Sequence, residues 1–202
     1  MISIVNYGVS NIGSMLNMMK KIGFPAQVVS TPAEIERADK IILPGVGAFD
    51  HGMLALMELG LVIPLKKRIV QDRVPILGVC LGMQLLAKGS EEGVLGGLDL
   101  IDGYCIRFQS NGDTSIRIPH MGWNELTIRR ESALLERLEG ARFYFVHSYH
   151  FVCTSQANVL ATAYYGNEFT AAVQCNNVWG VQFHPEKSHR FGMTLLSNFA
   201  RL

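Results

Sequence analysis

The chain lacks both an excess of charge of one sign and any long apolar segment. Eighteen lysine and arginine residues balance seventeen aspartate and glutamate residues, for a formal net charge of +1 over 202 residues. This balance argues against a nucleic-acid-binding surface, and no apolar run reaches the ~18 residues of a membrane helix. The first positive residues, Lys20 and Lys21, stand in the wrong order for a secretory signal peptide. We therefore expect a cytoplasmic protein that binds neither nucleic acid nor membrane.

Metal-binding patterns are also missing. The four cysteines form no C-x-x-C pair, and the histidines show no H-E-x-x-H spacing. We expect no metal site and no cofactor. Cys105, Cys153 and Cys175 lie in strand-like surroundings typical of small buried hydrophobic residues, whereas Cys80 has a different setting.

Hydrophobic residues make up 49% of the chain, enough for a sizeable core in one domain over residues 1–202. Strands are expected at 2–7, 26–29, 40–43 and 75–79, with helices near 11–22, 51–59, 62–71 and 81–87 and a capping box at 31–34. Further strands are expected at 104–108, 116–118, 125–128, 143–146, 159–164, 171–174 and 178–183, before a last helix at 190–201. The pattern predicts a three-layer α/β fold: a mixed, mostly parallel central sheet flanked by helices, with antiparallel strands added in the C-terminal half.

Cys80 is the centre of the sequence Gly78-Val79-Cys80-Leu81-Gly82, between an expected strand and an expected helix. This is the pattern of a nucleophile elbow, in which glycines allow a tight strand-to-helix turn, with cysteine in place of serine. A thiol at a helix N-terminus is favoured as the reactive thiolate. The alternative is a buried cysteine without function in an ordinary strand-to-helix turn, and these five residues alone leave both interpretations open.

A nucleophilic cysteine needs a base, and His184 is the best candidate among six histidines. It ends an apolar strand and is followed by Pro185 and Glu186. In an extended segment the side chains of His184 and Glu186 lie on the same side, so the carboxylate can fix the imidazole tautomer. A structural histidine–carboxylate pair is the alternative. Among the other five, His51 fits a surface position and His189 a helix cap, His120 follows Pro119 in a loop, and His147 and His150 lie in or beside a strand.

Thiolate attack on a carbonyl creates an oxyanion that needs hydrogen-bond donors. The backbone N–H of Leu81 directly follows the nucleophile. The segment Pro44-Gly45-Val46-Gly47 ends an earlier strand, and its glycines let the backbone approach a substrate. We expect donors at Leu81, Val46 and Gly47, although a tight turn without function would also explain the segment.

Five motifs together resemble the class I, or triad, glutamine amidotransferases. They lie at residues 78–84 and 181–186, and at the more specific segments 44–49 (PGVGAF), 119–124 (PHMGWN) and 144–149 (YFVHSY). The resemblance covers essentially the whole chain. The last three motifs are similar to those of the glutaminase subunits of imidazole glycerol phosphate synthases. A flavodoxin-like, three-layer fold is what this resemblance implies.

The resemblance also implies hydrolysis of L-glutamine to glutamate and ammonia. Cys80 would attack the side-chain amide, His184 would transfer protons, and Glu186 would orient His184. By similarity, the residues that hold glutamine are Gln84, Glu92 and the backbone of Gly47, Ser148 and Tyr149. A solvated loop charge is the alternative interpretation of Glu92.

Members of the family dock on a (β/α)8-barrel cyclase subunit, to which they pass ammonia. The resemblance implies such a heterodimer here, in histidine biosynthesis, with imidazole glycerol phosphate and aminoimidazole carboxamide ribonucleotide as products. Pro119, His120 and Trp123 resemble the interface anchors, and an exposed tryptophan in such a loop is a typical binding hot spot. Asn11, Ser14 and Lys187 match further positions that face the barrel. Free subunits of the family are poor glutaminases, so we expect the Val46–Gly47 amide to be turned away until the partner docks.

The chain departs from this pattern at a few positions. Asn6 replaces an aspartate of many relatives, and no mechanism depends on it. Residues 49–53, His150 and residues 188–193 resemble a paralogous branch linked to surface-polysaccharide biosynthesis, where the ammonia serves to form an acetamidino sugar. That role stays open as an alternative. A γ-glutamyl hydrolase or cysteine peptidase, and a catalytically silent binding subunit, would leave several of these motifs without use.

Overall fold

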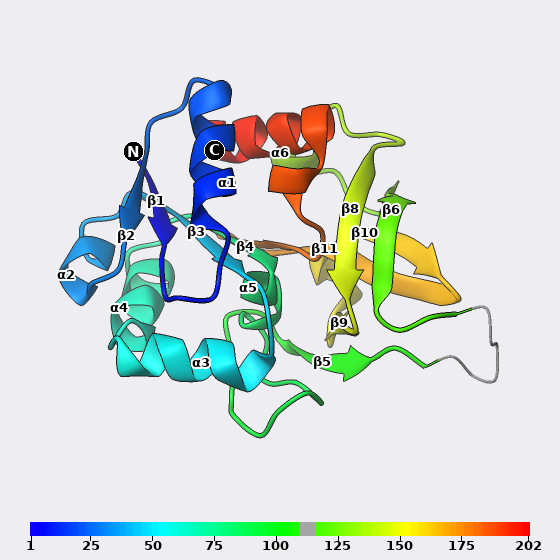
Figure 1. Ribbon diagram of the computed structural model, residues 1–202, viewed down its shortest axis with the longest axis horizontal. Helices are drawn as coiled ribbons and strands as arrows, with labels where there is room; N and C mark the ends of the chain where they lie inside the picture. The colour runs from blue at the N-terminus through cyan, green and yellow to red at the C-terminus, as the bar shows by residue number, and fades with distance from the viewer. Residues whose placement is uncertain (110–115) are drawn as a thin grey trace.

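Apolar parallel strands form the middle layer of the computed structural model, which describes residues 1–109 and 116–202 (Figure 1). The parallel part has the order β2-β1-β3-β4-β12. Its strands are β1 (Ile2–Val5), β2 (Ala26–Val29), β3 (Lys40–Gly45), β4 (Ile76–Cys80) and β12 (Val178–Val181). The residues of β1, β3, β4 and β12 are almost all buried, as a parallel sheet covered on both faces requires, whereas in the edge strand β2 only Val29 is buried.

Antiparallel strands extend the sheet beyond β12. They are β11 (Asn167–Cys175), β10 (Val159–Tyr165), β7 (Thr127–Ile128), β9 (Tyr149–Cys153) and β5 (Gly103–Arg107). Two more strands, β6 (His120–Glu125) and β8 (Arg142–His147), pair only with each other and form a separate ribbon. The expected mixed sheet, with antiparallel strands in the C-terminal half, is thus confirmed.

Helices cover both faces of the sheet (Figure 1). Their bounds are α1 (Ile12–Lys21), α2 (Pro32–Ile35), α3 (Phe49–Glu58), α4 (Val62–Lys66, continued by a π turn at Lys67–Gln71), α5 (Leu81–Gln84) and α6 (His189–Arg201). Neighbouring residues of β3 separate into two cores: Ile41 and Leu43 pack with α3 and α4, while Ile42 packs with α1 and α6. This alternation produces the three layers. No helix in the described parts of the chain is long and apolar enough to span a membrane.

Two strands were missed and one expected strand is wrong. Residues 116–118 do not form a strand, because the Tyr165 hydroxyl takes the place of a neighbouring strand: it accepts from the Arg117 N–H at 3.2 Å and donates to the Arg117 carbonyl at 2.6 Å. The missed strand β6 (HMGWNE) has few alternating apolar residues that a sequence pattern could reveal, whereas β9 (YHFVC) is mostly apolar and was predictable from its sequence. The expected strand at 125–128 is divided at Leu126 between β6 and β7, and the one at 178–183 ends at Val181.

The beginning of α6 is joined to the turn Pro185–Lys187 that precedes it. The Ser188 hydroxyl donates to the His184 carbonyl at 2.6 Å and accepts from the Tyr144 N–H at 3.0 Å. Gly192 packs directly on the Pro185 backbone, and a Cβ there would overlap the Pro185 carbonyl oxygen. The turn that carries His184 and Glu186 is therefore held between β8 and α6.

We expect Gly192→Ala to lower the free energy of unfolding by about 1–3 kcal/mol, the usual cost of overpacking a close contact. Gly13→Ala in α1 is the matched control, because a Cβ there meets no atom within 4 Å. It should raise stability by up to about 1 kcal/mol, since alanine favours a helix over glycine. Urea denaturation of both variants measures the difference, and equal effects at the two positions would contradict the packing argument.

Candidate active site

Cys80 has a backbone conformation that side chains rarely adopt. It ends β4 with φ 54° and ψ −110°, directly before α5. A Cβ on Gly78 would lie 2.6 Å from the Gly82 carbonyl oxygen, and one on Gly82 would overlap the Leu43 carbonyl oxygen. Both glycines of the motif are therefore required by close backbone approach. Strain of this kind persists only where the surrounding packing enforces it, and it is characteristic of nucleophile elbows.

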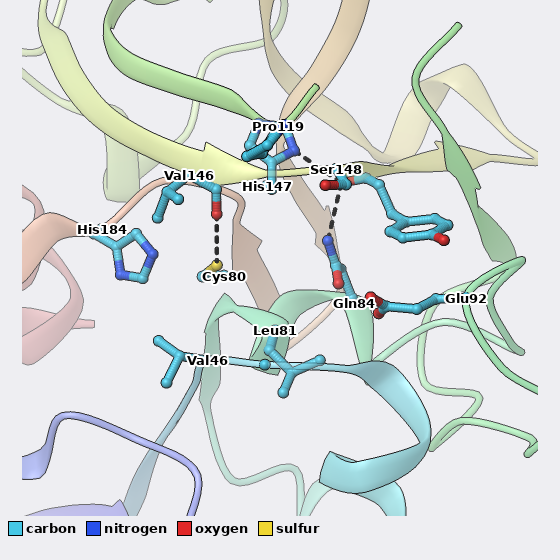
Figure 2. Close-up of a pocket in the computed structure, with 12 residues that line it drawn as sticks. Val46, Cys80, Leu81, Gln84, Glu92, Pro119, Val146, His147, Ser148 and His184 are labelled. Atoms are coloured by element: carbon cyan, nitrogen blue, oxygen red, sulfur yellow. Dashed lines mark hydrogen bonds between the residues drawn. The ribbon is translucent and has the colours of Figure 1, made fainter. Parts of the chain in front are cut away.

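The Cys80 thiol lies between β8 and β12, and it is 6% exposed. Its Sγ donates to the Val146 carbonyl at 3.9 Å and accepts from the Gln182 side-chain amide at 3.9 Å. The ring of His184 points toward it across the cavity (Figure 2). Among the residues that the structure describes, the thiol's hydrogen bonds are thus long and made to neutral groups, and it faces the imidazole predicted to act with it (Figure 2).

His184 and Glu186 form the pair that the sequence predicts. His184 Nδ1 lies 2.8 Å from Glu186 Oε1, and both side chains are buried. The residues between them lie in a 3-10 turn rather than in the extended segment we expected. Because Glu186 accepts the Nδ1 proton, Nε2 is left for other chemistry, and within residues 1–109 and 116–202 it has no hydrogen-bond partner.

The charge state of His184 depends on a balance of burial and neighbours. Burial by itself lowers the pKa of the imidazole, but the Cys80 thiol and the Glu186 carboxylate outweigh it and raise this pKa to about 10. Both neighbours therefore favour the protonated form of the His184 ring over the neutral one.

The expected oxyanion donors differ in their present partners. The Leu81 N–H stands at the start of α5, where backbone donors have no partner within the helix. The Val46 N–H instead donates to the Val9 carbonyl at 2.7 Å, so it is not free to bind an oxyanion at Cys80. Gly47 follows with φ 108°, a conformation suited to glycine.

Polar groups line the opposite wall of the cavity. The Gln84 amide donates to the Tyr149 carbonyl at 3.0 Å and to the Gln182 side-chain oxygen at 3.1 Å, which leaves the Gln84 carbonyl oxygen as an acceptor. Glu92 accepts from the Phe49 N–H at 2.9 Å, so it is anchored rather than a freely solvated loop charge. Figure 2 shows Gln84 and Glu92 side by side in the cavity.

One cavity of about 290 Å³ brings most of the predicted residues together. Its volume is near the lower end of the roughly 300–1,000 Å³ of small-molecule sites. The predicted residues that line it are Cys80, His184, Val46, Gly47, Leu81, Gln84, Glu92, Ser148, Tyr149 and Pro119. Glu186 stands behind His184 and does not line the cavity.

His147 lines the cavity as well, although no role there is predicted for it from the sequence. Its Nδ1 donates to the Tyr149 carbonyl at 2.8 Å, and its Nε2 accepts from His120 Nδ1 at 3.1 Å. Burial lowers the pKa of His147 to about 3 and that of His120 to about 4, so both rings are neutral near pH 7. This neutral pair fixes the carbonyl that also binds Gln84. In the sequence, the position of His147 just before Ser148 and Tyr149 is the signal that could have placed it at the cavity.

The residues expected to face a partner lie in different environments. Trp123 is 41% exposed and stacks on His189 at 5.4 Å, and Lys187 lies over the Tyr144 ring. Ser14 and Lys187 line one groove, next to Asn11, which caps α1. His120 is only 2% exposed, because its ring is stacked between Phe145 and Tyr165.

Comparison with known proteins agrees with this geometry. Among solved structures, a glutamine amidotransferase (TM-score 0.75, 21% identity, 99% of each chain) and PurLQS from Thermotoga maritima (TM-score 0.75, 20% identity, 99% of this chain and 97% of that one) share the fold. The imidazole glycerol phosphate synthase subunit HisH 2 of Methanococcus maripaludis is 50% identical over 202 residues, covering 100% of this chain and 99% of the relative. HisH 2 of Pseudomonas aeruginosa is 48% identical over 203 residues and the full length of both chains. The model of glutamine amidotransferase class-I matches residues 3–202, and the chain therefore belongs to this family of enzymes.

Proposed function

We propose that this chain is a glutaminase subunit that hydrolyses L-glutamine with a triad of Cys80, His184 and Glu186. The observation that carries the proposal is a strained cysteine elbow that shares one small cavity with a carboxylate-bound histidine and with Gln84 and Glu92. Residues 1–202 act as one glutamine amidotransferase domain. No cofactor takes part in the steps below.

The first half-reaction forms a thioester. The Cys80 thiolate attacks the amide carbon of the glutamine side chain, and the Leu81 N–H stabilises the oxyanion. The C–N bond then breaks as His184 Nε2 gives its proton to the leaving nitrogen. Ammonia departs and a γ-glutamyl thioester on Cys80 remains.

The second half-reaction restores the enzyme. His184 Nε2 takes a proton from water, which attacks the thioester carbonyl. The C–S bond breaks, glutamate leaves, and the Cys80 thiolate is again paired with a protonated His184. Throughout, Glu186 holds the Nδ1 proton and stabilises the imidazolium.

The polar wall of the cavity suits a free amino acid. The second carboxylate oxygen of Glu92 is available for an α-ammonium group, since the first binds Phe49. The carbonyl oxygen of Gln84 and the backbone of Gly47, Ser148 and Tyr149 offer further hydrogen-bonding groups along the cavity. A peptide substrate, with its α-nitrogen acylated, would bring no charge to Glu92, which disfavours the peptidase alternative.

Ammonia is passed to a (β/α)8-barrel cyclase subunit that uses it to make imidazole glycerol phosphate and aminoimidazole carboxamide ribonucleotide. The names of the relatives that are 48–50% identical over the whole chain support this role. Trp123, Lys187, Pro119, Asn11 and Ser14 form the docking surface. The barrel also controls hydrolysis: while Val46 donates to Val9, one oxyanion donor is missing, and docking turns this amide toward Cys80. Histidine biosynthesis in the cytoplasm is the corresponding pathway.

A second acceptor is favoured by residues 49–53, 188–193 and His150, which resemble the branch that supplies ammonia for an acetamidino sugar. The chemistry at Cys80 is the same in both cases. Only the partner and the fate of the ammonia differ.

Cys80→Ala should lower glutamine hydrolysis by at least about 10³-fold, because no other group can form the thioester. Cys175→Ala removes a half-buried thiol on β11 and serves as the control, with activity unchanged. The measurement is glutamate release by the purified chain with its barrel partner. Retained activity in Cys80→Ala would rule out the triad.

Glu186→Gln should move the alkaline limb of the kcat/KM profile to lower pH. Glu186 helps to hold the pKa of His184 above its ordinary value, so its neutral replacement lets that pKa fall, and the imidazolium is lost at lower pH. We expect kcat to fall by about 10²-fold or more, since the ring also loses its orienting partner. Glu131→Gln, on the surface near β7, should leave the profile in place; an unshifted profile for Glu186→Gln would contradict the assignment.

Glutaminase activity should rise by about 10²-fold or more when the cyclase subunit and its nucleotide ligand are added, as expected for gaining one oxyanion donor. Steady-state rates with the barrel of the histidine pathway, and separately with the paralogous barrel of the same organism, identify the acceptor. A rise with only the paralogous barrel would favour the sugar branch. Full activity of the chain without a partner would contradict the proposed control by the barrel, but it would leave the proposed hydrolysis of glutamine standing.

A further inference from the structure

The beginning of α3 and the loop at residues 92–95 hold each other through two carboxylates. Asp50, in the first turn of α3, accepts from the Val94 N–H at 2.9 Å and from the Leu95 N–H at 3.0 Å. Glu92, in the loop, accepts from the Phe49 N–H of α3 at 2.9 Å. Each segment thus supplies a carboxylate to the backbone of the other.

Two local features explain this reciprocal arrangement: the N-terminus of α3 has no capping side chain of its own, and the loop approaches Asp50 closely at Gly93. Ala48 stands at the N-cap of α3 and has no side-chain oxygen, so Glu92 supplies the acceptor from outside the helix. The loop comes very close to Asp50 at Gly93, where a Cβ would overlap the Asp50 carboxylate. A Cβ at this position is accommodated only if the Asp50 side chain and the loop move apart.

The consequence concerns the carboxylate of Glu92 in the cavity. Glu92 lines the cavity next to Gln84, at the end away from His184 (Figure 2). Glu92 is two residues before Val94, so the two hydrogen bonds from the loop to Asp50 fix the position of the Glu92 backbone. The hydrogen bond from the Phe49 N–H then fixes the position of the Glu92 carboxylate. Asp50 itself does not line the cavity.

We propose that Asp50 is a positioning residue that holds Glu92 in place and thereby sets the selectivity of the site for a substrate with a free α-ammonium group. The inference rests on the proposed role of Glu92 as the partner of that group. It assigns a function to Asp50, one residue of the segment at 49–53. Without Asp50 the loop moves relative to α3, and the charge of Glu92 no longer matches the ammonium position.

The test compares two ligands that differ only in the ammonium group: L-glutamine and 4-carbamoylbutanoate. Calorimetric titration of the full chain carrying Cys80→Ala avoids turnover. Asp50→Asn should weaken L-glutamine roughly tenfold, the size expected for lost hydrogen bonds to a charged acceptor. The affinity for 4-carbamoylbutanoate should stay unchanged. Because any unfolded fraction lowers both affinities equally, their ratio reports positioning alone.

Three further variants complete the test. Gly93→Ala pushes the loop off Asp50 without changing either carboxylate, and it should show the same selective loss. Glu58→Gln removes an equal charge from the other end of α3 and should change neither affinity. Glu92→Gln gives the reference, with the largest selective loss for L-glutamine.

Equal weakening of both ligands by Asp50→Asn, or no weakening of either, would overturn the inference while Glu92→Gln still shows the selective loss. If Glu92→Gln itself spares the preference for L-glutamine, the proposed role of Glu92 fails, and the inference fails with it. The two failures are therefore distinguishable.

Discussion

The close contact between the α5 backbone and β3 is the constraint on which the rest of the site depends. Gly82 lies directly against the Leu43 carbonyl, and Gly78 lies against the Gly82 carbonyl. Because these backbones leave no room for a Cβ, the chain must turn between β4 and α5 within one residue, and that residue is Cys80 with φ 54°. The cost of this conformation, of order 1–3 kcal/mol, is offset by the buried apolar strands on both sides.

The same contact brings the other parts of the site into register. Gly45 of β3 pairs with Cys80 of β4, so the segment with Val46 and Gly47 leaves the sheet beside the thiol. On the opposite side, Val181 of β12 pairs with Val79, and the chain continues to His184 three residues later. Three neighbouring parallel strands thus deliver the nucleophile, the base and the oxyanion segment to one edge, where sites of open α/β sheets form.

Local sequence was sufficient for the elements whose causes are local. The elbow at Cys80 and the cap at Thr31 were predictable because glycine spacing and capping residues act within a few positions. The strand β6 was not, because its six residues include polar ones and it pairs only with β8. The neutral state of His147 was also not predictable: it depends on burial that only the folded chain creates, and on His120, 27 residues away.

Energetics explain why a single backbone amide is a suitable point of control in the proposed mechanism. Turning the Val46 N–H away from Val9 costs one hydrogen bond, a net contribution of about 0.5–1.5 kcal/mol. A missing oxyanion donor lowers kcat by about 10²–10³-fold, equivalent to roughly 2.7–4 kcal/mol of the barrier. The conformational cost is therefore smaller than the catalytic effect that it controls. Docking of a partner on the neighbouring surface has to supply only that smaller amount, and Gly47, at φ 108°, gives the segment the backbone freedom to respond.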